Sequence, residues 1–236
     1  MPCNAMKYKL TDNTRIVDGH TLYQIKALEF TGIPSGALGG WLETPYNLDQ
    51  KGNCWVYQGA CVYGDACVTG SAEIFGNAQV YGHAQVREKA SVHGNARVYN
   101  HATVHGRAEI TGTSEISGEA YITDQAFLRD AIVKDHGVVH EFARVLGGSV
   151  IKIGIAGSFA RVTQQLTTQA RVLTGLNWTV TILDKHMQIG CKCRTFQAWK
   201  MMTDSDIDEM HPDALEFWTQ YKDILLALCD SQGGGV

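Results

Sequence analysis

The sequence lacks the features that place a protein in a membrane or on nucleic acid. No apolar stretch approaches the ~18 residues of a membrane-spanning helix, and the N-terminus has no signal-peptide apolar region. The formal net charge is only −4 and there is no run of Lys or Arg, so nucleic acid is not expected as a main partner. These absences indicate a cytoplasmic protein with no membrane partner, and Met6 is a second candidate start residue.

Cysteine provides no scaffold either. The chain has 7 cysteines, an odd number without the spacing of a disulfide framework, so reduced thiols are expected. Cys191 and Cys193 stand one residue apart, but no second pair of this kind accompanies them. His136 and His140 are expected on different faces of the fold, so they do not predict a zinc site. No metal is expected.

A six-residue repeat dominates the middle of the chain. From Ala60 to Asp130 it forms twelve blocks of the pattern Ala-x-Val-x-Gly-x, the last one residue short. The first position is Ala in eleven blocks, the third is always aliphatic, and the fifth is Gly in eight. The exceptions at the fifth position are Glu88, Asn100, Asp124 and Asp130. Asn and Asp tolerate positive φ better than most residues, so three of the four exceptions fit the same turn.

Each block predicts a very short strand followed by a bend. The first and third side chains share one face, and the turn residue redirects the chain every six residues. Three bends close a triangle, so eighteen residues form one coil, and successive coils stack ~4.8 Å apart with valines piled inside. After Asp130 the pattern resumes one residue early and continues to 149–151, with looser echoes at 160–162 and 170–172. The fold is therefore mainly β, a parallel β-helix of about seven coils.

The repeat divides the chain into three segments. We expect an N-terminal cap at 1–36, the β-helix at 37–175 and a C-terminal β-hairpin with helices at 176–236. Residues 7–30 alternate like one or two strands that cover the open edge of the first coil. Two further strands are predicted around a turn at Asp184-Lys185.

Two helices are predicted in the C-terminal segment. Thr195 is placed to cap a helix that begins at Phe196, and Pro212 suits the start of a longer one. The longer helix has an apolar stripe at helical spacing that is expected to pack against the β-helix or a neighbouring subunit. The stripe consists of Phe217, Trp218, Tyr221, Ile224, Leu225 and Leu228.

The hexads resemble those of the hexapeptide-repeat acyltransferase superfamily, and the match covers more than half of the chain. This resemblance implies a left-handed parallel β-helix and a homotrimer. The chain more closely resembles a group of phage and prophage hexapeptide proteins, which are commonly described as acetyltransferases from their fold alone. Four stretches carry this resemblance: GALGGWLETPYNL, GNCWV, IGCKCRTFQAWKMM and DALEFWTQYKDILLAL. It implies a phage origin, with the bacterial host's cytoplasm as the location.

Stacked coils turn an eighteen-residue spacing into a column on the surface. Tyr63, Tyr81 and Tyr99 have this spacing and predict an aromatic ladder, hereafter the tyrosine ladder. Aromatic residues favour stacked strands in any protein. The ladder also suits a subunit interface or a surface on which a nucleobase stacks.

A corner of the coil carries a second column, the histidine column, and two flanking residues are expected beside it. The column consists of Asp65, His83, His101, Glu119 and His136, and the flanking residues are Arg87 and His105. Three interpretations stay open: polar turn residues, an anion site built from imidazole and guanidinium groups, or a histidine general base. The candidate bases are His83, His101 and His105. The candidate ligand-binding residues are Tyr63, Tyr81, Arg87, Tyr99, His101, His105, Glu119 and His136.

Two functions follow from these features. The first is a non-catalytic, phage-type binding protein without a cofactor, a homotrimer whose inter-subunit clefts hold a small anionic molecule such as a nucleotide signal of host defence. The second is an acyltransferase that uses acetyl-CoA and a histidine base, as superfamily precedent favours. Two departures favour binding: Gly comes one place later than in the acyltransferases, and blocks 60–154 leave no room for the long loop that shapes their acceptor site.

Overall fold

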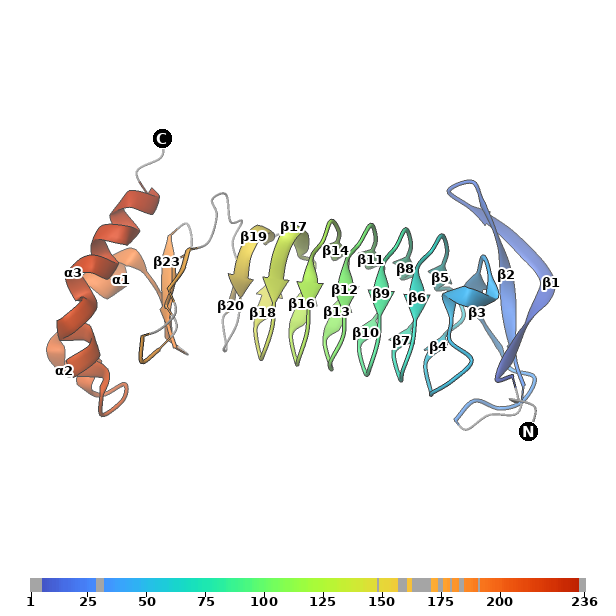
Figure 1. Ribbon diagram of the computed structural model, residues 1–236, viewed down its shortest axis with the longest axis horizontal. Coiled ribbons are helices and arrows are strands. Elements are labelled where there is room, and N and C mark those ends of the chain that lie inside the picture. The colour runs from blue at the N-terminus through green and yellow to red at the C-terminus, as the bar shows by residue number, and fades with distance from the viewer. Residues whose placement is uncertain are drawn as a thin grey trace.

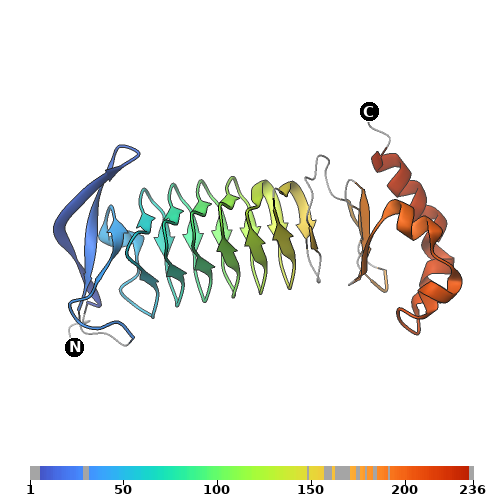
Figure 2. The same cartoon turned by 180° about the vertical axis from the view of Figure 1, so that it is seen from behind.

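The chain folds into a row of stacked coils that ends in a hairpin on one side and in helices on the other (Figure 1). The same order is seen from behind in Figure 2. This computed structural model describes residues 6–28, 32–147, 149–156, 161–162, 171–173, 176–178, 180–182, 185–190 and 192–233.

Each coil contributes short strands to three faces. The first face contains β3 (Leu38–Leu42), β5 (Cys61–Val62), β8 (Gln79–Val80), β11 (Arg97–Val98), β14 (Glu115–Ile116) and the starts of β17 (Ile132–Val139) and β19 (Val150–Ala156). The second contains β6 (Cys67–Val68), β9 (Gln85–Val86), β12 (Thr103–Val104), β15 (Tyr121–Ile122) and the ends of β17 and β19. The third contains β4 (Trp55–Val56), β7 (Glu73–Ile74), β10 (Ser91–Val92), β13 (Glu109–Thr111), β16 (Phe127–Arg129), β18 (Arg144–Leu146) and β20 (Arg161–Val162).

The strands of each face pair in parallel at the predicted register. Val80 lies opposite Val62 on one side and Val98 on the other, eighteen residues away in each direction. Where the repeat loses one residue, the spacing falls to seventeen and Glu115 pairs with Ile132. A mainly β fold with a parallel β-solenoid is therefore confirmed. It has about six turns and not seven, because the seven strands stacked on a face are linked by six full turns of the chain. The left-handed sense stays a prediction.

The side chains inside the coils explain the pattern of the repeat. All twelve third-position aliphatic side chains of the blocks from Ala60 to Asp130 are fully buried, from Val62 to Leu128. The fifth-position residues adopt the positive φ that the bend requires, and the non-glycine residues share it: φ is 58° at Asn100 and 62° at Glu88. Glu88 therefore follows the rule too, although its side chain has no special tolerance for this conformation.

The N-terminal strands form a hairpin that continues the first face. β1 (Tyr8–Val17) and β2 (His20–Ala27) pair antiparallel through a turn at Asp18 and Gly19, both with positive φ as a two-residue hairpin turn requires. β2 then pairs antiparallel with β3, and Trp41 and Leu42 of β3 pair in parallel with β5 on the other side. Between β3 and β4 lies a short 3-10 helix, η1 (Pro45–Asn47). The hairpin covers the edge of the sheet that the first coil would otherwise leave open.

The C-terminal strands form a separate antiparallel sheet. Its order is β21 (Arg171–Leu173), β22 (Val180–Ile182), β23 (His186–Ile189) and β24 (Lys192–Thr195). β22 and β23 are the predicted strand pair; Asp184 of their turn lies outside the described residues. The repeat echo at 160–162 contributes β20 to the third face, whereas the echo at 170–172 contributes β21 to this sheet, paired with β22.

Three helices follow the sheet: α1 (Phe196–Met201), α2 (Asp204–Asp208) and α3 (Ala214–Gly233). The predicted cap is confirmed, since the Thr195 side chain accepts a hydrogen bond from the Ala198 backbone N–H. The expectation that α3 packs on the solenoid is wrong, because its buried side chains form a core with β22, β23 and α1, whereas packing on a neighbouring subunit stays a prediction. Ile224 does not belong to this stripe: it is 62% exposed. It lies about 100° around the helix from Leu225, which is buried.

Candidate functional site

The tyrosine ladder is present as predicted. The rings of Tyr63 and Tyr81 stack with centroids 5.0 Å apart and planes 4° from parallel, and Tyr81 and Tyr99 stack at 5.0 Å and 2°. The spacing follows from the solenoid, which places equivalent residues of successive coils one strand separation apart. The ladder is therefore a flat aromatic strip along the first face.

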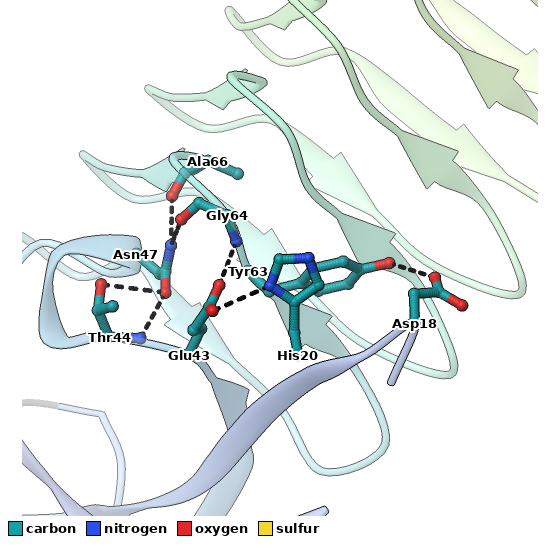
Figure 3. Close-up of polar contacts among 8 residues, drawn as sticks. All are labelled: Asp18, His20, Glu43, Thr44, Asn47, Tyr63, Gly64 and Ala66. Atoms are coloured by element: carbon teal, nitrogen blue, oxygen red, sulfur yellow. Dashed lines mark hydrogen bonds and ion pairs between the residues drawn. The ribbon is translucent and has the colours of Figure 1, made fainter. Parts of the chain in front are cut away.

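The N-terminal hairpin covers one end of this strip. Tyr63 is only 2% exposed, and its hydroxyl donates a hydrogen bond of 2.8 Å to Asp18 at the hairpin turn. The His20 ring lies beside the Tyr63 ring (Figure 3), and their centroids are 5.1 Å apart. Burial, and then the bond to Asp18, raise the pKa of Tyr63 far above its usual value. Tyr63 is thus not available to a ligand in this conformation, whereas Tyr81 and Tyr99 are half-buried.

A dense polar cluster fastens the hairpin to the first coil (Figure 3). The Glu43 carboxylate pairs with His20 Nδ1 at 2.9 Å and accepts from the Gly64 backbone N–H at 2.7 Å. The bond to His20 holds the pKa of Glu43 below its usual value. The Asn47 amide donates to the Gly64 and Ala66 carbonyls, at 2.9 Å each. Because these groups satisfy one another, the polar residues of WLETPYNL form a structural fastening and not a ligand site.

The histidine column is also a real spatial column. The rings of His83 and His101 stack with centroids 4.8 Å apart and planes 7° from parallel. Asp65 lies 3.4 Å from His83 Nδ1 at one end, and Glu119 lies 3.2 Å from His136 Nδ1 at the other. All five side chains are exposed. The column offers two adjacent imidazole rings to solvent, with a carboxylate beside His83 and a second His–carboxylate pair further along.

The two residues expected to flank this column lie at the far end of the second face. His105 follows β12, whereas His101 precedes it. The contacts of His105 are with its own face: Thr123 Oγ1 at 3.3 Å from Nδ1, Glu88 at 3.7 Å and the Tyr121 ring at 4.8 Å. Its Nε2 is buried and has no hydrogen-bond partner among the described residues. His105 is therefore poorly placed as a general base, because Nδ1 already contacts Thr123 and Nε2 is buried, so neither nitrogen is positioned to take a proton from a ligand.

Arg87 is the equivalent residue one coil earlier than His105. It lies at the end of β9 on the second face and is exposed. Arg87 and His105 thus form a separate column, and the width of the second face separates it from the histidine column that they were expected to flank.

A polar groove of about 660 Å³ runs along the corner between the third and first faces. Sequence reasoning missed it. Asn77 and Asn95 bond to each other there through their side-chain amides at 3.2 Å, and Arg97 pairs with Glu115 at 2.6 Å. The eighteen-residue spacing of Asn77 and Asn95 was the available signal. The groove is internally paired and does not include the histidine column.

In comparisons with known proteins, the chain matches no protein-family model and no curated protein. In the part of the chain that the structure describes, no three His, Cys, Asp or Glu side chains gather in a way that could hold a metal ion. None of the described helices is long and apolar enough to cross a membrane.

Proposed function

We propose that the chain is a non-catalytic binding protein that assembles as a homotrimer and holds a small anionic molecule in the clefts between its subunits. The observation that carries the proposal is the adjacency of two stacked columns. Tyr81 and His83 are separated by one residue, and Tyr99 and His101 by one residue in the next coil. Two phenol rings and two imidazole rings therefore lie in neighbouring columns at the edge of the first face, with rings stacked about 5 Å apart.

This array suits a nucleotide better than a simple ion. A nucleobase gains by meeting the edges of the stacked phenol rings in edge-to-face contacts, and a phosphate gains by accepting hydrogen bonds from imidazole. Tyr81 and Tyr99 are half-buried although their rings stack on each other, so part of each side chain is apolar surface that the same chain does not cover. A second copy of the chain laid along this edge would cover it and close a cleft beside the histidine column.

The regular coils support binding over acyl transfer. From Cys54 to Gly147, the described strands follow one another at spacings of eighteen or seventeen residues per coil, so no long loop leaves the solenoid there. Such a loop shapes the acceptor site in the acyltransferases that the repeat resembles. The resemblance to phage proteins extends the proposal to a role, the removal of a nucleotide signal of host defence.

The test is calorimetric titration of the full-length protein with adenosine monophosphate as the probe. We expect saturable binding that weakens by about 10- to 100-fold when His83 and His101 are both replaced by alanine, because charge-assisted hydrogen bonds are lost. His93 is the matched control: it also stacks on an aromatic ring, Phe75 at 4.4 Å, but on the third face. His93→Ala should bind as the unchanged protein does.

Two results would contradict the proposal. One is an absence of saturable binding by adenosine monophosphate up to millimolar concentration. The other is acetyl-CoA turnover that His101→Asn reduces by ~10²–10⁴ with little change in ligand affinity, because a lost general base affects the rate and not the binding.

A further inference from the structure

A second cavity lies in the C-terminal part of the chain and is lined only by residues from Trp178 onward. Its volume is about 100 Å³. The walls come from the end of the antiparallel sheet, from α1 and from the start of α3, and include Trp178, Ile189, Trp199, Phe217 and Trp218. No residue of the tyrosine ladder or the histidine column takes part, so this cavity is independent of the proposed function.

The walls are aromatic and fixed. Trp199, Phe217 and Trp218 are each 2% exposed, and the Trp199 indole N–H donates to the Met187 carbonyl at 2.6 Å. The ring of Trp178 meets that of Phe217 edge to face, with centroids 5.0 Å apart and planes at 65°. A planar ring between such walls would gain both apolar burial and edge-to-face contacts.

The size of the cavity limits its occupant. An engineered apolar cavity of about 150 Å³ holds benzene. A cavity of about 100 Å³ that opens to the surface therefore suits one six-membered ring, with any substituent at the mouth.

One wall residue has a buried hydrogen-bond donor. The indole Nε1 of Trp218 is buried and has no hydrogen-bond partner among the described residues. A buried donor left unpaired is costly.

The mouth is rich in donors. The exposed residues of the lining are Lys192 and His211. The Nδ1 atom of His211 accepts from the Asp213 backbone N–H at 3.2 Å, so the neutral ring carries its proton on Nε2, where it is free to donate. The Asp213 carboxylate, 3.7 Å from His211 Nδ1, is the acidic group beside this rim.

We propose that this cavity binds a small aromatic carboxylate, with its ring among the indoles and its carboxylate at the rim beside Lys192. The aromatic walls select a planar ring, the volume selects a single ring, and the ammonium group of Lys192 selects an anionic substituent.

Three probes with the same ring test the charge preference: benzoate, benzyl alcohol and benzylamine, titrated into the full-length protein with tryptophan fluorescence and calorimetry as readouts. Benzoate should bind saturably with a Kd on the order of 1 mM or tighter, and about tenfold more tightly than benzyl alcohol. Tighter binding of benzylamine would overturn the proposal in favour of a cation cage. A lack of saturable benzoate binding up to roughly ten times that Kd would overturn it altogether.

Two variants locate the site. Lys192→Gln should reduce the affinity for benzoate to that for benzyl alcohol. Lys185 is the control, because it is exposed and directly precedes β23; Lys185→Gln should change the affinity for neither probe. Ala214→Leu fills the cavity, because Ala214 belongs to its lining, and should abolish binding of benzoate and benzyl alcohol while the far-UV circular dichroism is unchanged. Benzoate binding that survives Ala214→Leu, or a preference for benzoate that survives Lys192→Gln, would show that the assignment is wrong.

Discussion

Replacing Gly118 by alanine should destabilise the solenoid more than the same replacement at Gly64, although both residues occupy the same corner of different coils. Both have positive φ, 67° at Gly118 and 64° at Gly64. A Cβ atom added at Gly118 would lie 2.5 Å from the backbone nitrogen of Asp135 and 2.7 Å from its Cα. At Gly64 the nearest atom, the backbone nitrogen of Gly82, would be 3.1 Å away.

The two sites share one cost and differ in another. Alanine in the left-handed conformation costs roughly 1–2 kcal/mol at either site. Overpacking adds roughly 1–3 kcal/mol at Gly118, because the obstructing atoms are backbone and cannot rotate away. The Asp135 carbonyl is held by the Glu119 backbone N–H at 2.6 Å, so relief requires a shift of the whole coil. We therefore expect losses of about 2–5 kcal/mol for Gly118→Ala and about 1–2 kcal/mol for Gly64→Ala.

Urea unfolding followed by circular dichroism at the β-sheet minimum measures both losses. The difference in midpoints at equal slope reports how much more overpacking Gly118→Ala causes than Gly64→Ala, because the backbone cost is common to the two variants. Equal losses, or a larger loss at Gly64, would show that contact between coils does not govern which turns require glycine.

Three further predictions concern the two ends of the chain. Tyr63→Phe removes the hydrogen bond to Asp18 and should lower the free energy of unfolding by about 1 kcal/mol in urea titration; no change would mean that the hairpin is held by packing alone. The pKa of Glu43 lies below its usual 4.5, so its contact with His20 stabilises the fold above that pH and is lost as the pH falls through the lowered pKa. The melting temperature between about pH 5 and pH 3 should therefore fall more steeply for the unchanged protein than for Glu43→Gln, and parallel curves would contradict this. Leu225→Lys should cost several kcal/mol and abolish the near-ultraviolet tryptophan signal, whereas Ile224→Lys, one position away and exposed, should be tolerated; equal effects would show that α3 packs differently.

The solenoid could be predicted because every block of the repeat has the same inward-facing position and the same turn position. An aliphatic residue every six positions fixes what faces inward, and a turn residue every six fixes where the chain bends. The eighteen-residue arithmetic even placed the stacked pairs of Tyr81 with Tyr99 and of His83 with His101. Each of these contacts depends only on residues in the same position of neighbouring coils.

The ends could not be predicted to the same depth, because their contacts join segments with no common period. Nothing in the spacing of Asp18 and Tyr63 indicates that the hairpin turn reaches the tyrosine ladder, yet that contact removes Tyr63 from the exposed surface. The helical spacing of α3 identified an apolar stripe but not its partner, because amphipathicity does not name the surface that is covered. The core of α3 with β22 and β23 is visible only once the sheet is in place.

In the proposed trimer, three copies of the chain enclose a ligand beside the histidine column. Native mass spectrometry of the purified full-length protein measures this assembly best, because it reports the number of subunits and any bound molecule together. We expect a species of about 78 kDa, three times the chain mass of 25.9 kDa, with a small additional mass that is lost on collisional activation. A single species of 25.9 kDa at micromolar concentration, with no bound mass, would contradict it.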